Sequence, residues 1–185
     1  MCVLVAAALA ITTVTGRDAV AAESAITTYG ERNPEAPAEL DLFSFLVGKW
    51  SGRKRLADGN HAEWTWIGRY VLNGMAIADE LHASADGKQY LGITLRQFGT
   101  EHDTWIVEFL NVSSSFLRRQ VNASSGSVSR EADSVVVISE DAQTRIRERY
   151  RLVDQNQFTY TLDQSLDAGR SWGPVSIEMT MTRVE

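Results

Sequence analysis

The chain has 185 residues, a formal net charge of -6 and a single cysteine, Cys2. Once an N-terminal segment is set aside, about 160 residues remain, which is enough for one domain with a hydrophobic core and tight for two. The acidic balance argues against a nucleic-acid-binding protein, because such a protein needs a clustered basic face to neutralise phosphates.

The N-terminal segment has the features of a processing signal. Residues 3–14 form an apolar run that is too short to span a bilayer. Ala19-Val20-Ala21 follows with the small-x-small pattern of a cleavage site, which predicts a signal peptide over residues 1–22 and an exported protein. No Lys or Arg precedes the run, so a disordered or helical N-terminus is the alternative. Cleavage would remove Cys2 and leave the mature domain without a disulfide.

Residues 23–38 are polar and contain Pro34 and Pro37, which indicates an extended lead-in. The apolar spacing of residues 40–47 favours one or two helical turns, with Gly48 ending them. The remaining domain is predicted over residues 39–185. No segment after residue 22 is apolar and long enough for a transmembrane helix, so no integral membrane segment is expected in the mature chain.

After Gly48 the pattern alternates with period 2, and turn dipeptides such as Asn73-Gly74 and Asp86-Gly87 interrupt it. This pattern is typical of tight β-hairpins. A sandwich also fits such strands, but we predict an all-β fold: an antiparallel up-and-down β-barrel of about ten strands with a short N-terminal helix. The predicted strands are 49–56, 61–71, 75–83, 89–98, 103–111, 116–123, 134–139, 144–152, 157–164 and 175–184.

Alternation also predicts which side chains face inward. Several strands place aromatic residues on one side, and the strand 144–152 opposes Glu148 and Tyr150 to four arginines. In the strand 89–98 two alternatives stay open. Either Leu91, Ile93 and Leu95 form the core, or Tyr90, Thr94 and Arg96 line a cavity while the aliphatic set packs outward.

The segment 43–52 (FSFLVGKWSG) resembles the opening of calycin-like, or lipocalin-like, barrels, in which a short helix precedes Gly-x-Trp. In those proteins the Trp plugs one end of the barrel and an Arg from the last strand lies against it. The resemblance assigns these structural roles to Trp50 and Arg183. Alternation independently places Arg183 on the inner face, where its cation can stack on the indole.

Residues 40–185 also resemble an uncharacterised family of bacterial calycin-like domains. The resemblance rests on the opening, Asn73-Gly74, Asp86-Gly87 leading to Tyr90-Leu91-Gly92, Trp105, and the late turn 165–172 (SLDAGRSW). It implies a fold and no activity. Some small barrels with a similar opening bind haem through a late histidine, and no histidine follows His102, so no cofactor is expected.

The turn 165–172 also matches the Asp-box of sialidase propellers, which is a structural hairpin. Asp167 can bond the backbone of the turn, Gly169 can take a positive φ, and Trp172 can pack beneath. A single copy does not make a propeller. We therefore assign these three residues structural roles.

Candidates for chemistry are few. The three histidines show no zinc-ligand spacing, so no metal site is predicted. Glu148 lies on an apolar inner face and Glu80 shares a face with His82 near the expected barrel mouth. A buried carboxylate can act as a general acid or base, although the plainer expectation is that Glu148 pairs with an inward Arg or caps the barrel mouth.

The favoured function is binding of a small apolar or amphipathic ligand in the barrel interior, because ligand sites are mostly apolar with a few polar anchors. The alternatives are an enzyme (a cyclase, isomerase or hydrolase) acting through Glu148, Glu80 or His82, or an interaction domain that oligomerises through an edge or an exposed aromatic patch. The sequence specifies neither the ligand nor the oligomeric state. The predicted ligand-binding residues are Trp64, Trp66, Tyr70, Tyr90, Arg96, Phe158 and Tyr160.

Overall fold

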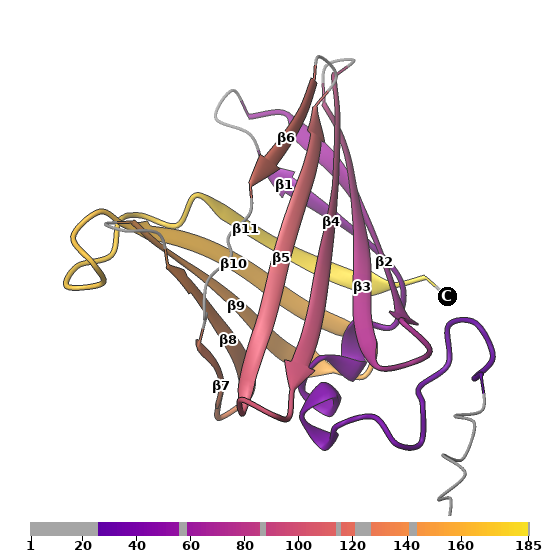
Figure 1. Cartoon of the computed structure of the whole chain (residues 1–185). Coiled ribbons are helices and arrows are strands. Elements are labelled where there is room, and N and C mark those ends of the chain that lie inside the picture. Colours follow the sequence, from indigo (N-terminus) through magenta and orange to yellow (C-terminus); the bar gives the residue numbers. More distant parts are fainter. Residues whose placement is uncertain are drawn as a thin grey trace, which may run out of the picture.

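The protein is a nearly closed antiparallel β-barrel (Figure 1). The computed structural model describes residues 26–55, 59–85, 88–113, 116–120, 127–140 and 144–184, so the predicted signal peptide lies outside the described residues. Within these ranges there are eleven strands and one short helix. They are η1 (Ala38–Leu46), β1 (Gly48–Arg55), β2 (His61–Val71), β3 (Ala76–Ala85), β4 (Lys88–Gly99), β5 (Thr104–Ser113), β6 (Phe116–Gln120), β7 (Ser127–Glu131), β8 (Ser134–Glu140), β9 (Arg145–Asp154), β10 (Gln157–Ser165) and β11 (Ile177–Arg183).

The strands form one sheet in the order β6-β5-β4-β3-β2-β1-β11-β10-β9-β8-β7. Every neighbouring pair in this order is antiparallel, including β1 with β11, the pairing that joins the first and last strands. β6 and β7 lie at the two ends of the sheet, and β7 contacts β5. The predicted all-β barrel is confirmed. The described residues contain one more strand than expected, β7.

The helix forms where it was predicted, as a 3-10 helix that begins two residues earlier. Leu40, Phe43 and Leu46 are its buried residues, with no exposed surface. Their spacing of three matches the three residues per turn of a 3-10 helix, so all three side chains lie on one face. This face covers the end of the barrel drawn lowest in Figure 1.

Trp50 fills the barrel end that the helix covers. The indole is 1% exposed and its Nε1 donates a hydrogen bond to the Leu46 carbonyl at 3.1 Å. Arg183 pairs with Trp50 across β1 and β11, and its guanidinium lies 4.1 Å from the ring centroid. The same guanidinium donates to the carbonyls of Val47 at 2.8 Å and Phe45 at 3.2 Å. Arg183 therefore connects the last strand to the end of the helix through these hydrogen bonds. Its guanidinium stacks on the Trp50 indole, as the sequence suggests.

Glycine is required where the end of the helix crosses β2. Gly68 forms a bridge with Val47, and a Cβ at position 68 would collide with the backbone carbonyl of Leu46. A larger residue would push the helix away from the barrel end.

The turn at Asn73-Gly74 differs from the expected tight hairpin. Val71 pairs with Ala76, so the loop has four residues, and Leu72, Asn73 and Gly74 all take positive φ values. Asn73 also holds the lead-in, because its side-chain oxygen accepts from the Thr27 backbone N–H at 2.6 Å. Asp86-Gly87 lies outside the described residues, between the paired residues Ala85 and Lys88.

Candidate ligand site in the barrel interior

Strand register sorts the side chains into an inner and an outer set, because directly paired residues point to the same face of a sheet. Trp64 pairs with Ala83, and Ala83 pairs with Tyr90, so all three face inward. On the opposite wall Glu148 pairs with Leu162, and Leu162 pairs with Ile177. The set Tyr90, Thr94 and Arg96 is therefore the inward one. Leu91, Ile93 and Leu95 pack outward, which settles the question that alternation left open.

The interior has a closed half and an open half. Near the helix the inward side chains are fully buried: Ile77, Arg96, Phe158 and Met181 have no exposed surface. Toward the other end, inward side chains keep part of their surface exposed although they point away from the outside of the barrel. These half-buried residues are Leu81, Ala83, Tyr90, Phe109, Asn111, Ile146, Glu148, Leu162 and Ile177. Solvent therefore reaches the interior from this end, which we call the open half.

A buried ion pair lies beneath the open half. Arg96 on β4 forms an ion pair with Asp79 on β3, and neither side chain has exposed surface. Arg96 also donates a hydrogen bond to the Tyr150 hydroxyl at 2.9 Å, and its guanidinium lies 5.0 Å from the centroid of the Phe43 ring. Buried charges are costly unless they are paired and hydrogen-bonded. Arg96 has its counter-ion in Asp79 and one hydrogen bond to Tyr150, while its Nε is buried without a hydrogen-bond partner among the described residues.

Glu148 links this layer to the open half. Tyr160 donates a hydrogen bond to one carboxylate oxygen at 2.7 Å, and the Tyr150 hydroxyl lies 3.5 Å from the other. Glu148 does not form the expected ion pair with an inward arginine among the described residues, because Arg96 is paired with Asp79 and reaches Glu148 only through Tyr150. The result is a continuous polar chain across the interior, from Asp79 to Tyr160.

The tyrosines of the interior hold their protons unusually tightly. Burial, followed by the nearby negative charge of Glu148, raises the pKa of Tyr90 to about 12. The pKa of Tyr160 is raised well above its ordinary value by the same two causes in the same order. Burial also raises the pKa of Tyr150, with the Arg96 charge opposing and Glu148 adding to the shift. All three phenols therefore stay protonated at neutral pH.

The raised pKa values predict a loss of stability in alkali. A group whose pKa is higher in the folded protein stabilises it fully below the unfolded value, near 10.0, and this contribution is lost as pH rises toward the folded value. We expect unfolding by circular dichroism between about pH 10 and 12, together with tyrosine ionisation measured by absorbance at 295 nm. Tyr160→Phe should make the transition less steep. Reversible ionisation of these phenols near pH 10 in a folded protein would contradict the prediction.

Comparison with known proteins gives no family assignment. No family model matches the chain, and no curated protein does. Among solved structures, the chain is similar to the S-type phycobiliprotein lyase CPES from Guillardia theta, with 11% identity, a TM-score of 0.47, and coverage of 78% of this chain and 92% of that one. It is also similar to a redesigned β-barrel, mFAP0, bound to DFHBI, with 13% identity, a TM-score of 0.41, and coverage of 76% and 100%.

The residues predicted to bind a ligand all face inward, but they lie at different depths. Trp64 and Tyr90 belong to the open half, with ring centroids 5.9 Å apart. Trp66, Tyr70, Arg96, Phe158 and Tyr160 are buried and form the layer beneath it. Their binding role stays a prediction.

Sequence reasoning missed Asp79, Phe109 and Asn111 as interior residues. Phe109 stacks on Tyr90 with centroids 6.5 Å apart and an interplanar angle of 21°. Asn111 pairs with Gly92, and its side-chain oxygen is buried with no hydrogen-bond partner in the described part of the chain. The register of β5 against β4 identifies both residues, once it is known that Tyr90 faces inward.

Glu80 and His82 do not face the barrel mouth, so that expectation is wrong. Glu80 pairs with Ile67 and Ile93, which both belong to the outer set. Its carboxylate accepts a hydrogen bond from Arg69 at 2.5 Å, and this bond is the main cause that lowers the pKa of Glu80. The His82 ring nitrogen Nε2 lies 3.4 Å from the other Glu80 oxygen. The outer face therefore holds both candidates.

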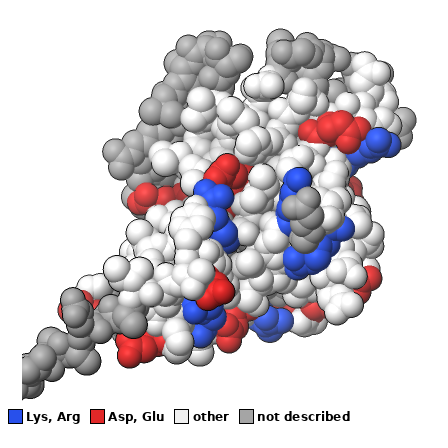
Figure 2. Space-filling model, turned by 90° about the vertical axis from the view of Figure 1, so that its right-hand side faces the viewer, with Lys and Arg blue, Asp and Glu red and all other residues white. Residues whose placement is uncertain are grey.

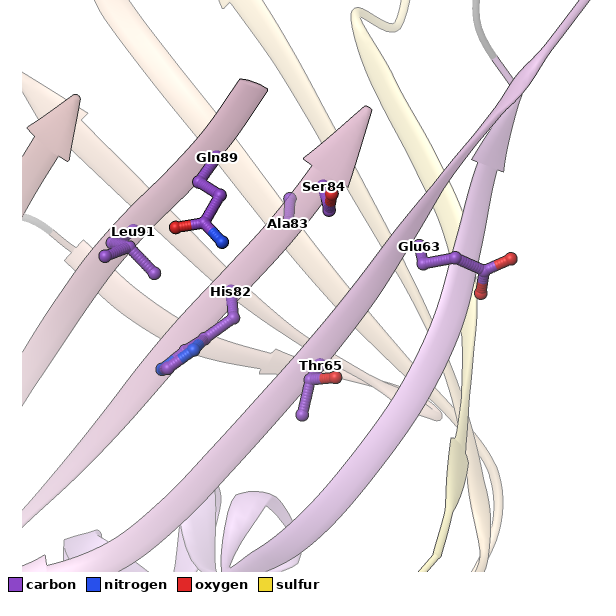
Figure 3. Close-up of a pocket in the computed structure, with 7 residues that line it drawn as sticks. All are labelled: Glu63, Thr65, His82, Ala83, Ser84, Gln89 and Leu91. Atoms are coloured by element: carbon purple, nitrogen blue, oxygen red, sulfur yellow. The ribbon is translucent and has the colours of Figure 1, made fainter. Parts of the chain in front are cut away.

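A hollow of about 370 Å³ lies on this outer face (Figure 3). Of its seven lining residues, Leu91 alone carries a large apolar side chain. The others are Glu63, Thr65, His82, Ala83, Ser84 and Gln89. Figure 2 shows basic and acidic side chains interspersed on the face that it presents, with no broad patch of one sign.

The late turn has the geometry expected of a structural hairpin. Asp167 accepts hydrogen bonds from the Ser171 hydroxyl at 2.6 Å and from the Ser171 backbone N–H at 2.8 Å, and these bonds hold its pKa well below the usual range. Gly169 takes a φ of +87°. Trp172 lies on the outer side of the barrel, where the Arg147 guanidinium stacks 4.1 Å from its ring centroid.

The described part of the chain holds neither a metal-binding set of side chains nor a membrane-spanning helix. No three His, Cys, Asp or Glu side chains there come together as a set that could hold a metal ion. None of the described helices has the length and apolar character needed to cross a membrane.

Proposed function

We propose that this chain is an exported binding protein that holds a small apolar or amphipathic ligand in the open half of its barrel. The observation that carries the proposal is the division of the interior. One half is sealed by the helix, Trp50 and Arg183, whereas the other presents inward side chains with exposed surface. Apolar walls with a few polar groups are typical of small-molecule sites.

The chemistry of the open half fits an amphipathic ligand. Trp64, Tyr90 and Phe109 provide an aromatic wall, and Leu162 and Ile177 provide aliphatic surface on the other side. Glu148 is the polar anchor. The Nε1 of Trp64 is a further buried donor, without a hydrogen-bond partner among the described residues.

Export is part of the proposal and is supported by the apolar run and Ala19-Val20-Ala21. Cell fractionation and N-terminal sequencing of the mature protein test it. A mature chain that begins near residue 22 or 23 in the exported fraction supports the proposal, and an uncleaved chain in the cytoplasm contradicts it. The uncharacterised bacterial family that the sequence resembles is the proposed family.

Native mass spectrometry of protein purified from its host compartment tests the binding function. We expect a co-purifying small molecule, which should then bind again to ligand-stripped protein. Ala83→Phe should weaken this binding at least about tenfold, because Ala83 faces inward between Trp64 and Tyr90 and a phenyl group would fill the open half.

Ser84→Phe is the matched control, because Ser84 is the next residue of β3 and points to the outer face, where it pairs with Glu63 and Gln89. It should leave binding unchanged. Both variants should be compared by thermal unfolding, since overpacking an interior costs about 1–3 kcal/mol. If Ser84→Phe abolishes binding while Ala83→Phe does not, the ligand occupies the outer hollow and the interior site is wrong.

A further inference from the structure

Glu148 carries a negative charge into the open half, and no positive partner in the described chain neutralises it. The other inward carboxylate near it, Asp79, is neutralised by Arg96 in a pair without exposed surface. The hydrogen-bond partners of Glu148 are neutral phenols, Tyr150 and Tyr160. Glu148 is half-buried, so its charge is only partly hydrated. A partly desolvated carboxylate of this kind is stabilised by a positively charged partner.

The aromatic wall faces the same space. The wall consists of Trp64 on β2, Tyr90 on β4 and Phe109 on β5. Glu148 lies on β9. The charge of Glu148 is the second cause, after burial, of the raised pKa of Tyr90, so the carboxylate and the phenol lie within electrostatic reach of each other. Aromatic faces attract cations through their negative π-systems, most strongly where water is excluded.

We infer that the ligand carries a protonated amine, held between the Glu148 carboxylate and the aromatic wall of Trp64, Tyr90 and Phe109. The inference rests on the proposed function, because it names the ligand class of the same interior site. The apolar body of the ligand packs on the aromatic and aliphatic walls, and its ammonium group donates to the Glu148 oxygens. An anionic ligand would place two negative charges together in a partly desolvated space.

Lys54 is the residue that favours an anionic ligand over a cationic one. It pairs with Ala62, which places it on the inner face toward the rim of the open half. A ligand with a carboxylate or phosphate would use Lys54 instead of Glu148. The experiment must therefore compare ligand charges directly.

Three probes with one aromatic body separate these outcomes: 1-naphthylmethylamine, 1-naphthalenemethanol and 1-naphthoate. Binding is measured by isothermal titration calorimetry at fixed low salt. We expect the amine to bind at least about tenfold more tightly than the alcohol, and the naphthoate more weakly than either. Glu148→Gln should remove the preference for the amine while leaving binding of the alcohol unchanged. Glu178→Gln makes the same chemical change at an exposed position of β11 and should change nothing.

The outcomes separate the two proposals. If the alcohol binds and Ala83→Phe blocks it, but the amine gains nothing, the proposed function stands and the ligand class is wrong. Tighter binding of the naphthoate that is lost in Lys54→Gln also overturns the ligand class. If none of the three probes binds to folded protein, both proposals fail. Thermal unfolding of Glu148→Gln shows whether the variant is folded, and the retained binding of the alcohol shows that its site is intact.

Discussion

Replacing Asp79 with alanine is expected to lower the free energy of unfolding by about 3–5 kcal/mol, because it leaves the Arg96 charge buried without its counter-ion. Neither side chain has exposed surface, so water cannot replace the lost carboxylate without opening the barrel. Arg96 also bonds Tyr150, and the loss should therefore disturb the polar chain that reaches Glu148. Urea denaturation followed by tryptophan fluorescence measures the effect.

The double variant Asp79→Leu, Arg96→Met is the control for this prediction. Apolar residues of similar volume can replace a buried ion pair at little cost, so the double variant should be more stable than Asp79→Ala. An exposed pair gives the second comparison. Arg53 and Glu63 lie 2.8 Å apart with 70% and 59% of their side chains exposed, and Glu63→Ala should cost less than about 1 kcal/mol. A double variant as unstable as Asp79→Ala would show that the packing of this layer matters more than its charge.

Strand pattern predicted most of the fold because most strands have one buried face. The burial of β2 alternates along its whole length, and the sequence shows the same alternation of aromatic and polar residues. β7 was missed for the opposite reason. Its five residues are polar apart from Val128, and four of the five are exposed, so nothing in the pattern marks a strand. Its existence depends on pairing with β8, which a single sequence does not reveal.

The candidate site was predicted where alternation was clear and missed where it failed. Glu148 was placed correctly because β9 separates its inward residues from four arginines. The sequence of β3 shows no such alternation between an inner and an outer face. Its residues Ala76 to Asp79 are all buried, so both faces look alike in sequence, and Glu80 and His82 were assigned to the wrong side of the barrel. The partner of Arg96 was also hidden, because Asp79 becomes its neighbour only through the register of β3 against β4.

The second large effect is expected at the closed end. Trp50→Ala should lower the free energy of unfolding by about 3–5 kcal/mol, the usual cost of removing a large aromatic side chain from a core. The indole is 1% exposed, packs edge-on against Phe158 with centroids 4.9 Å apart, and bonds the carbonyl of Leu46. Its removal also takes away the surface on which Arg183 stacks. Urea denaturation followed by far-ultraviolet circular dichroism avoids the change in fluorescence that the substitution itself causes.

Trp172→Ala is the matched control, because Trp172 also stacks beneath an arginine but lies on the outer side of the barrel. Arg147 keeps its two hydrogen bonds to Asp163, at 3.0 and 2.5 Å, when the ring is removed. Trp172 and Arg147 are half-buried, so the cost should stay near that of one partly exposed cation–π contact, about 0.5–2 kcal/mol, and below the cost at Trp50. Equal losses at the two positions would mean that Trp50 is only one contact among many. The helix would then stay on the barrel without the Trp50 indole. Residues other than Trp50 would seal this end and leave the open half as the way in for a ligand.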